Sequence, residues 1–479
     1  MKRKYVNRII AVVLTLALAL SGLWAINRVL IMKRNDGILT MQNFYAQPEG
    51  TVDVLLVGNS HSGINVDTAT LWSEYGLSAY NLWGGVQPLW NSYHFIVEAL
   101  KTQRPQVICL EITATVSDYE YSEEQNQIKN VAGMKLSKNK LEAVKATAPQ
   151  ERWLNLLLGF PLYHGRFNEL EQQDFECFPW SAGLENYKGS YLLYGVGNYQ
   201  KESAEGVTAR REIMDKELDY LMKIIELCKQ ENIPLMLFKT PTVEREKEQE
   251  IFNTVADIAD ENGLPFVNMN LMDSELGITA QDYSTDRHMN GSGARKVAHW
   301  LGAYLAENYA LTDHRGDARY NSWEINSHNI NNDYLAAITA NDDYFAELRR
   351  NGRSALIVKN EPWTDNDEFA ALADGLDSIG LKGIVERGGE KDAYLITDTA
   401  TGGEAPASIN GDTVSFTLDG KELTVNFEYQ DIVYSGKRVI WFGASDVVMV
   451  VYDNVTHEVA DVCVFTSGNR FELQRAETD

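Results

Sequence analysis

The apolar run Val54–Val57 ends abruptly at Gly58, and small polar residues, among them Ser60, follow it. A short, continuous apolar run of this kind is typical of a strand that is buried on both faces, as in a parallel sheet. The chain must turn sharply at the carboxyl end of this strand, where ligands bind in open α/β sheets. Ser60 is therefore a candidate nucleophile, and such a serine needs a base, an orienting acid and oxyanion donors.

Short apolar runs alternate with helical patterns over the first two thirds of the chain. The runs that predict strands lie at residues 53–58, 78–82, 107–110, 235–238 and 266–268. Helical spacing is found at residues 89–101, 214–228, 243–262 and 291–309. This alternation predicts an α/β fold with a parallel, doubly wound sheet of the flavodoxin-like type.

Residues 113–205 interrupt the alternation with a long, aromatic and irregular stretch. So long an excursion inside an α/β domain is usually functional, as a lid or as a wall of the substrate site. A structural insertion is the alternative. His164, Arg166 and Lys188 in this excursion are candidates for binding an anionic or sugar group, with solvated surface positions as the alternative.

The N-terminus has a basic flank followed by an uncharged run of 18 residues, from Ile9 to Ile26. This run meets the lower length limit of a membrane span. A cleaved signal peptide usually has a shorter apolar region and a small-x-small cleavage site, to which Leu20–Ala25 is a poor match. We therefore predict an uncleaved, single-pass anchor in the cell membrane, with the chain after about residue 35 outside the cytoplasm.

The charge and the cysteines limit the partners. The 479 residues include 68 acidic and 43 basic ones, a formal net charge of -25, which argues against nucleic acids and anionic membrane surfaces. Cys109, Cys177, Cys228 and Cys463 show no Cys-x-x-Cys spacing. Because Cys109 and Cys463 lie in apolar, strand-like runs and Cys228 lies on an apolar helix face, we expect buried free thiols and no metal site, and no cofactor is predicted.

From about residue 315 the pattern changes to short alternating runs separated by Asn, Asp and Gly. Strands are predicted at residues 354–358, 413–418, 423–428, 438–442, 447–452 and 460–465, with one helix near 367–378. This spacing predicts a separate β-rich domain. The expected division is an anchor at 1–35, an α/β domain at 36–312 and a β-rich accessory domain at 313–479.

The partners that Ser60 needs are present in a polar segment just before the last predicted helix of the α/β domain. Asp286 and His288 are two residues apart, so the carboxylate can accept a hydrogen bond from one imidazole nitrogen while the other nitrogen faces the serine. A polar loop that merely caps the next helix, with Asn290 as the cap, would contain the same residues.

Three blocks occur in a fixed order: Gly58–Ser62 after the first predicted strand, Gly84-Gly85 after the second, and Asp286–Asn290 before the last helix. Together they resemble the SGNH (GDSL-like) hydrolase superfamily over residues 50–310. The resemblance implies that Ser60 is the nucleophile, His288 the base and Asp286 its orienting acid. It also implies that the backbone N–H groups of Ser60 and of Gly85 or Gly84 form the oxyanion hole.

Two features depart from the family. Leu110–Thr113 stands where a Gly-x-Asn-Asp block is expected, so one oxyanion donor is unassigned, and Asn81 and Gln87 are candidates to replace it. The acid and base are also spaced Asp-x-His rather than Asp-x-x-His. His61 and His94 are interpreted as a loop residue and a helix-face residue.

The closer spacing resembles a membrane-anchored branch that includes alginate O-acetylation proteins and, more distantly, the D-alanyl transfer protein of teichoic acid synthesis. This resemblance implies acyl transfer through an acyl-Ser60 intermediate outside a bacterial cytoplasm. The acceptor is a surface polysaccharide (O-acetyltransferase) or water (acetyl esterase), and a membrane protein that donates the acyl group is a candidate partner. The rival hypothesis is a non-catalytic envelope scaffold that keeps the fold and binds glycan.

The C-terminal domain carries a fainter resemblance. Val448–Asp453, followed by Glu458–Val462, resembles the lectin-like domain of interleukin-like inducer proteins. That resemblance implies glycan binding without catalysis, and a plain β-sandwich of another role is the alternative.

Overall fold

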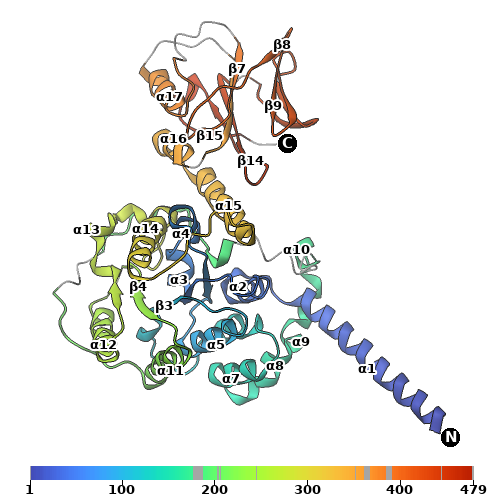
Figure 1. Ribbon diagram of the computed structural model, residues 1–479, viewed down its shortest axis with the longest axis vertical. Helices are drawn as coiled ribbons and strands as arrows, with labels where there is room; N and C mark the ends of the chain where they lie inside the picture. Colours follow the sequence, from blue (N-terminus) through green and yellow to red (C-terminus); the bar gives the residue numbers. More distant parts are fainter. Residues whose placement is uncertain are drawn as a thin grey trace. The chain divides into compact units, whose positions relative to one another are not determined.

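The computed structural model describes residues 2–175, 187–201, 204, 206–243, 245–350, 352–360, 367–383, 391–443 and 445–476. The chain divides into two compact units, Met1–Ser327 and His328–Asp479 (Figure 1). The second domain predicted from the sequence begins at residue 313, within the first unit.

Five parallel strands form the sheet of the first unit. They are β1 (Val54–Gly58), β2 (Ala79–Trp83), β3 (Val107–Glu111), β4 (Leu235–Lys239) and β5 (Phe266–Asn268). Their order, β2-β1-β3-β4-β5, is the flavodoxin-like order. The predicted α/β fold is confirmed. Because the strands are parallel, their carboxyl ends lie along one edge, with β1 at the point where the strand order reverses.

Helices cover both faces of this sheet. Side chains of α5 (Leu89–Ala99), α11 (Asp215–Glu231) and α12 (Glu246–Asn262) share one apolar cluster with Leu55 and Leu110. Side chains of α4 (Thr68–Tyr75) and α14 (Gly291–Asn308) share the other with Leu56 and Cys109. Burial on both faces is why the strands appear as continuous apolar runs in the sequence.

Short helices make up most of the rest of this unit. They are α2 (Thr40–Phe44), α3 (Ser60–Asn65), α6 (Glu124–Ala132), α7 (Lys138–Thr147), α8 (Trp153–Leu158), α9 (Phe160–Tyr163), α10 (Gln172–Phe175) and α13 (Asp273–Leu276). Single turns include η1 (Asn35–Leu39), η2 (Thr113–Val116), η3 (Gln150–Arg152), η4 (His164–Asn168), η6 (Tyr187–Gly189), η7 (Met269–Leu271), η8 (Ala280–Asp282) and η9 (Ala318–Tyr320). The described start of the excursion, residues 113–175, is therefore largely helical.

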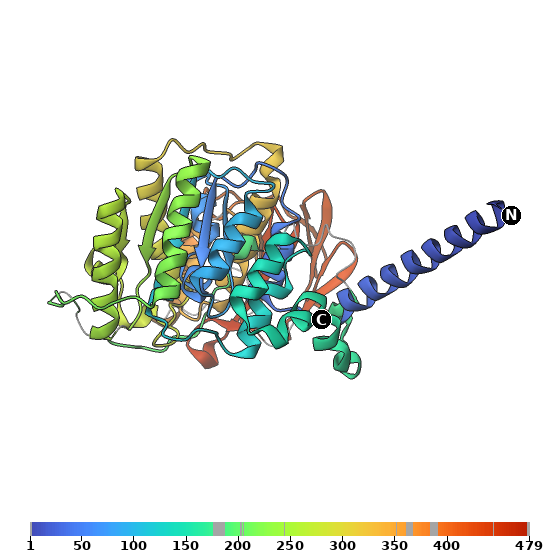
Figure 2. The ribbon, with the colours of Figure 1, turned by 90° about the horizontal axis from the view of Figure 1, so that it is seen from below.

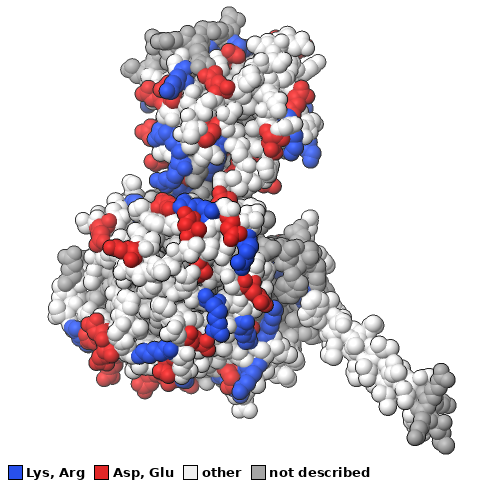
Figure 3. Space-filling view, in the orientation of Figure 1, with Lys and Arg blue, Asp and Glu red and all other residues white. Residues whose placement is uncertain are grey.

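The N-terminal helix α1 (Lys2–Leu30) projects from the first unit (Figure 2). Its segment Tyr5–Leu30 is long and apolar enough to cross a membrane, a test that a signal sequence also passes. Beyond its undescribed tip, the visible surface of α1 is almost free of charged side chains (Figure 3).

Two antiparallel five-stranded sheets form the second unit, and the predicted β-rich region is confirmed. One sheet has the order β15-β14-β13-β6-β7, from β6 (Ser354–Lys359), β7 (Asp392–Ile396), β13 (Val447–Asp453), β14 (Glu458–Phe465) and β15 (Gln474–Arg475). The other has the order β12-β11-β10-β9-β8, from β8 (Ser408–Asn410), β9 (Thr413–Leu418), β10 (Lys421–Asn426), β11 (Asp431–Tyr434) and β12 (Lys437–Trp441).

Helices add a third layer to this unit. Alternate residues of β13 pack in opposite directions: Val448 joins the cluster between the sheets, and Met449 joins side chains of α16 (Asn341–Arg350) and α17 (Asp367–Ser378). The sequence predicted α17 but not α16 or α15 (Asn321–Ala337), which runs across the division between the units. Both begin in stretches rich in Asn and Asp, which have low helix propensity.

Close packing behind Ser60 makes Gly63 intolerant of a side chain. A Cβ atom at Gly63 would lie 2.0 Å from the Trp83 ring, whose Nε1 donates to Gly189 O at 2.6 Å. We expect Gly63→Ala to destabilise the protein by about 1–3 kcal/mol, because overpacking outweighs the better helix propensity of alanine. A lowered thermal midpoint of the full chain in detergent would show this.

Gly206→Ala is the matched control, since a Cβ atom there meets nothing within 4 Å. Equal midpoints for the two variants would contradict the prediction.

Candidate active site

Ser60 is the first residue of α3 and directly follows the turn at the carboxyl end of β1. Asn59 caps the helix: its Oδ1 accepts the backbone N–H of His61 at 3.0 Å. The first N–H groups of a helix have no acceptor within the helix. The turn therefore presents a half-buried serine hydroxyl beside backbone donors that suit a developing oxyanion.

His288 faces this serine from the loop between η8 and α14. Its Nε2 lies 2.8 Å from Ser60 Oγ. Met289, the next residue, donates its backbone N–H to Asn65 Oδ1 at 3.0 Å, and Asn65 Nδ2 donates to Thr240 Oγ1 at 3.0 Å. The fully buried amide of Asn65 thus ties the histidine loop to α3 and to the chain after β4. Sequence reasoning did not single out Asn65.

The imidazole of His288 is poised in its neutral form. Burial lowers the pKa of His288 to about 4, the charge of Asp286 opposes that shift, and Arg287 and Lys239 add to it. A neutral imidazole near pH 7 can accept the serine proton. The distance and the protonation state together give the pair the geometry of a nucleophile and its general base.

The other imidazole nitrogen has a different neighbour from the predicted one. His288 Nδ1 lies 3.4 Å from Thr285 Oγ1, which also accepts the backbone N–H groups of Arg287 and His288 at 3.2 and 3.0 Å. Asp286 is exposed, and among the described residues no hydrogen bond or ion pair joins it to His288. In this structure Asp286 affects His288 through its charge, and its role as an orienting acid stays a prediction.

His61 belongs to the site, although the sequence was interpreted as placing it in a plain loop. Its ring is buried and stacks on the ring of His288, with centroids 5.2 Å apart. His61 Nδ1 lies 2.9 Å from Asn59 Oδ1, which can only accept, so Nδ1 carries the proton. Its Nε2 is buried, and burial lowers the pKa of His61 well below the usual range, while a hydrogen bond with the Arg287 backbone opposes that shift. The position of His61 directly after Ser60 in the motif Gly-Asn-Ser-His was the sequence feature that could have indicated this.

Two charged residues lie buried at the ends of the neighbouring strands, Glu111 on β3 and Lys239 on β4. Burial raises the pKa of the Glu111 carboxyl, and the Lys239 charge opposes that shift. Glu111 accepts the hydroxyl of Thr113 at 2.5 Å, and Lys239 Nζ donates to Thr242 Oγ1 at 3.2 Å. The fixed positive charge of Lys239 helps to keep the histidines beside it neutral.

The predicted oxyanion groups other than Ser60 have internal neighbours. Asn81 is fully buried and paired with Ser62: its Oδ1 accepts the hydroxyl at 2.7 Å, and its Nδ2 donates to the carbonyl at 2.6 Å. Gln87, also buried, donates its Nε2 to Ser92 Oγ at 3.0 Å. Both amides make local hydrogen bonds, and their role toward a ligand stays a prediction.

The two glycines after β2 lie against other parts of the first unit. A Cβ atom at Gly84 would meet Asn130, and one at Gly85 would meet Asp36. Asn130 also donates to Gly85 O at 3.1 Å. The oxyanion role of these glycines stays a prediction.

The three basic side chains of the excursion also have internal acceptors. Arg166 donates to Leu30 O at 2.6 Å and pairs with Asp174 at 3.2 Å, and exposed His164 contacts Pro161 O through Nδ1 at 2.9 Å. The buried ammonium of Lys188 donates to Gln47 Oε1 and Ser322 Oγ at 2.8 and 2.7 Å and lies over the Trp323 ring. Each of the three contacts another part of the same unit, and their role in binding a ligand stays a prediction.

Residues 190–197, which we name the strap, border the site. The backbone N–H of Tyr191 donates to Gly63 O in α3 at 2.8 Å, and that of Gly197 donates to Tyr283 O at 2.7 Å. The strap therefore connects the helix that begins at Ser60 with the loop that carries His288. Tyr191 and Tyr194 on the strap are partly exposed.

In the described part of the chain, no group of three or more His, Cys, Asp and Glu side chains is arranged to hold a metal ion. Cys109, Cys228 and Cys463 are buried free thiols, as predicted. Cys177 lies outside the described residues.

Comparison with known proteins adds little to this description. No family model matches the chain, and no curated protein matches it. A solved structure from Bacteroides fragilis, described as that of "a putative acylhydrolase", aligns with 55% of this chain and 90% of its own. The two share 11% sequence identity, with a TM-score of 0.28.

The depressed pKa of His288 can be measured directly. In the full chain in detergent micelles, we expect the His288 imidazole signal to titrate near pH 4 by NMR, with His288→Asn assigning the signal. In the unfolded chain this imidazole binds its proton near pH 6.5. The contribution of His288 to the free energy of unfolding, about 3 kcal/mol in all, is therefore present above pH 6.5 and is lost as the pH falls toward 4. A midpoint near 6.5 in the folded protein would contradict the burial described above.

Proposed function

We propose that this chain is a membrane-anchored, SGNH-type serine enzyme that transfers an acyl group outside the cytoplasm. The acyl group passes from an ester donor to Ser60 and then to a hydroxyl of a cell-surface polysaccharide or to water. The observation that carries the proposal is the 2.8 Å contact between Ser60 Oγ and His288 Nε2 at the carboxyl edge of a flavodoxin-like sheet. Ligands bind at this edge in such sheets.

The chemistry follows from these two side chains. Ser60 Oγ attacks the carbonyl carbon of the donor as its proton passes to His288 Nε2. The N–H group of Ser60 at the start of α3 stabilises the oxyanion of the tetrahedral intermediate. The intermediate collapses, the C–O bond to the donor alcohol breaks, and that alcohol takes the proton from His288. An acceptor hydroxyl or water then repeats the sequence in reverse and frees Ser60.

The N-terminal helix supports the location. Segment Tyr5–Leu30 can cross a membrane, and the basic residues before it favour a cytoplasmic N-terminus. The rest of the chain then lies outside the cytoplasm, where an envelope polysaccharide and a membrane protein that donates acyl groups are accessible. The exposed tyrosines of the strap, Tyr191 and Tyr194, suit stacking against sugar rings.

A non-catalytic, glycan-binding scaffold is the second candidate. The observation that favours it is the lack of a carboxylate hydrogen-bonded to His288 Nδ1 within the described residues. Trp441, 61% exposed on the edge strand β12, fits polymer binding by the second unit under either hypothesis.

Trapping the acyl-enzyme separates the two candidates. The full chain in detergent should gain an acetyl group on Ser60 when incubated with p-nitrophenyl acetate, detected by intact mass and peptide mapping. Ser60→Ala and His288→Ala should abolish the adduct, because one lacks the nucleophile and the other the base. Ser73→Ala, on α4, is the matched control and should keep it. No adduct and no ester turnover by the unaltered chain would favour the scaffold.

Asp286 should contribute modestly. Losing a carboxylate that is hydrogen-bonded to the base lowers kcat by about 10⁴-fold in serine proteases. Because Asp286 is exposed and acts through charge alone, we expect Asp286→Asn to slow acylation by less than about tenfold. Removing its negative charge should also lower the pKa of His288 further, which moves the acidic limb of the pH–rate profile to lower pH. A loss of three or more orders of magnitude would show a direct hydrogen bond during the reaction.

A further inference from the structure

An exposed apolar surface surrounds the point where α1 joins the first unit. Its members are large side chains of α8, α9, η4 and α10, which together we name the apolar platform (residues 153–175). The most exposed are Leu154 at 64%, Leu158 at 52%, Phe167 at 66% and Phe175 at 56%. Exposed apolar groups gathered in this way mark an interaction surface.

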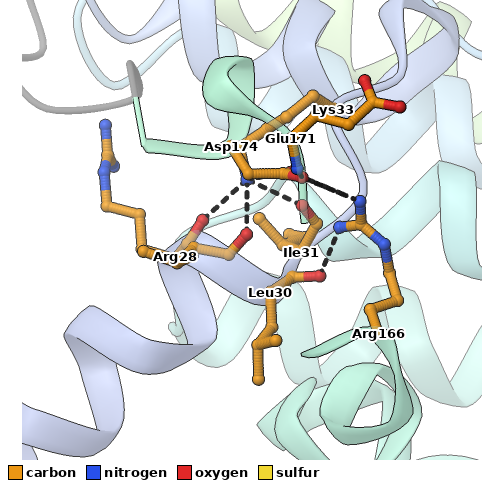
Figure 4. A network of polar contacts seen from close by, with 8 residues as sticks. Arg28, Leu30, Ile31, Lys33, Arg166, Glu171 and Asp174 are labelled. Atoms are coloured by element: carbon orange, nitrogen blue, oxygen red, sulfur yellow. Dashed lines mark hydrogen bonds and ion pairs between the residues drawn. The ribbon is translucent and has the colours of Figure 1, made fainter. Parts of the chain in front are cut away.

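The platform is fixed to the end of α1 by a polar network (Figure 4). Lys33 Nζ donates to Arg28 O at 2.8 Å and to Ile31 O at 2.7 Å, so it caps the last carbonyls of the helix. Arg166 of the platform caps Leu30 O. Buried Asp174, also of the platform, pairs with both cations, with Lys33 at 3.4 Å and with Arg166 at 3.2 Å. The orientation of α1 against the platform is therefore built from buried ionic contacts.

A groove of about 660 Å³ separates α1 from the platform and from the start of the excursion. One wall is formed by Leu20, Leu23 and Trp24 of α1. The opposite wall includes Leu158 and Phe160 of the platform. Arg28, Lys135 and Lys140 also line the groove, so an apolar groove lies beside three cations.

We propose that the apolar platform lies in the outer leaflet of the bilayer that α1 spans, and that the groove holds an acyl chain of a phospholipid. The inference rests on the proposed membrane anchor. A helix of 26 residues is about 39 Å long, while the hydrocarbon core is about 30 Å thick. Leu20 and Leu23 lie well within that length, so the groove they line opens at the depth of the acyl chains and headgroups, not in bulk water.

Charge also favours a phospholipid as the occupant. The net charge of -25 opposes general adsorption to an anionic surface, so membrane contact must come from apolar burial. Arg28 and Lys135 at the groove suit the phosphate of a headgroup while the chain lies against leucine and phenylalanine. Apolar side chains of α1 and of the platform line the same groove, which is the arrangement expected of an interfacial segment beside a span.

Lipid quenching in proteoliposomes tests the placement. Each variant is the full chain with Cys177→Ser and one introduced cysteine, which replaces Leu158, Phe167, Leu16 or Glu226 and carries the fluorophore NBD. The variants are placed in vesicles of zwitterionic phosphatidylcholine that contain doxyl-labelled lipid. Leu16 on α1 reports the anchor, and Glu226, exposed on α11, is the aqueous control. We expect quenching at Leu158 and Phe167 to reach at least half of that at Leu16, with none at Glu226.

The other outcomes overturn the inference in distinguishable ways. Quenching at Leu16 without quenching at Leu158 and Phe167 would leave the anchor intact and refute the platform. A blue-shifted but unquenched label at Leu158 would show that a protein, such as a second copy, covers the surface. No quenching at Leu16 would refute the anchor itself and, with it, this inference. Thermal midpoints equal to that of the unlabelled chain would verify that each variant is folded.

Discussion

The buried amide of Asn65 is the contact on which the arrangement of the site depends. Through one oxygen and one nitrogen it joins the end of α3, the backbone of Met289 and the hydroxyl of Thr240, which come from three distant parts of the chain. A buried amide can satisfy these partners only in one geometry, so the histidine loop is held at one distance from the nucleophile. The 2.8 Å approach of Ser60 to His288 thus follows from a residue outside the reacting pair.

Electrostatics around the pair favours a neutral base and makes the charged base costly. Burial and Lys239 hold the pKa of His288 down to about 4, which keeps the imidazole neutral but opposes the imidazolium that the proposed acylation would form. Asp286 is the described charge that offsets this penalty, and it does so from an exposed position. The buried ring of His61 stacks on that of His288, so the site contains a second imidazole that burial keeps neutral.

The sheet could be predicted from the sequence because strands that are buried on both faces consist of continuous apolar runs. Since the strands are parallel, Ser60 after the first strand lies at the edge of the sheet where ligands bind. The encounter of Ser60 with His288 followed from motif order. Thr285 beside Nδ1, in place of Asp286, depends on a backbone turn that spacing alone does not determine. Lys188 and Arg166 were expected to bind a ligand because the sequence does not show their acceptors. Those acceptors, Gln47 for Lys188 and Leu30 O for Arg166, lie more than a hundred residues away in the chain.

The described parts of the excursion, residues 113–205, lie at two different locations. Neither a lid nor a structural insertion alone describes both of them. Its helical part packs on the end of α1, where Asp174 pairs with Lys33, and its strap borders the candidate active site. The helical part also contributes Val131, Val144 and Leu156 to the apolar cluster that covers one face of the sheet. One insertion therefore contacts both α1 and the helix that begins at Ser60. In the proposed enzyme, which would take an acyl group at a membrane and deliver it to an outer polymer, the site must stay at a fixed position relative to that membrane. The ionic contacts between α1 and the same insertion would supply this.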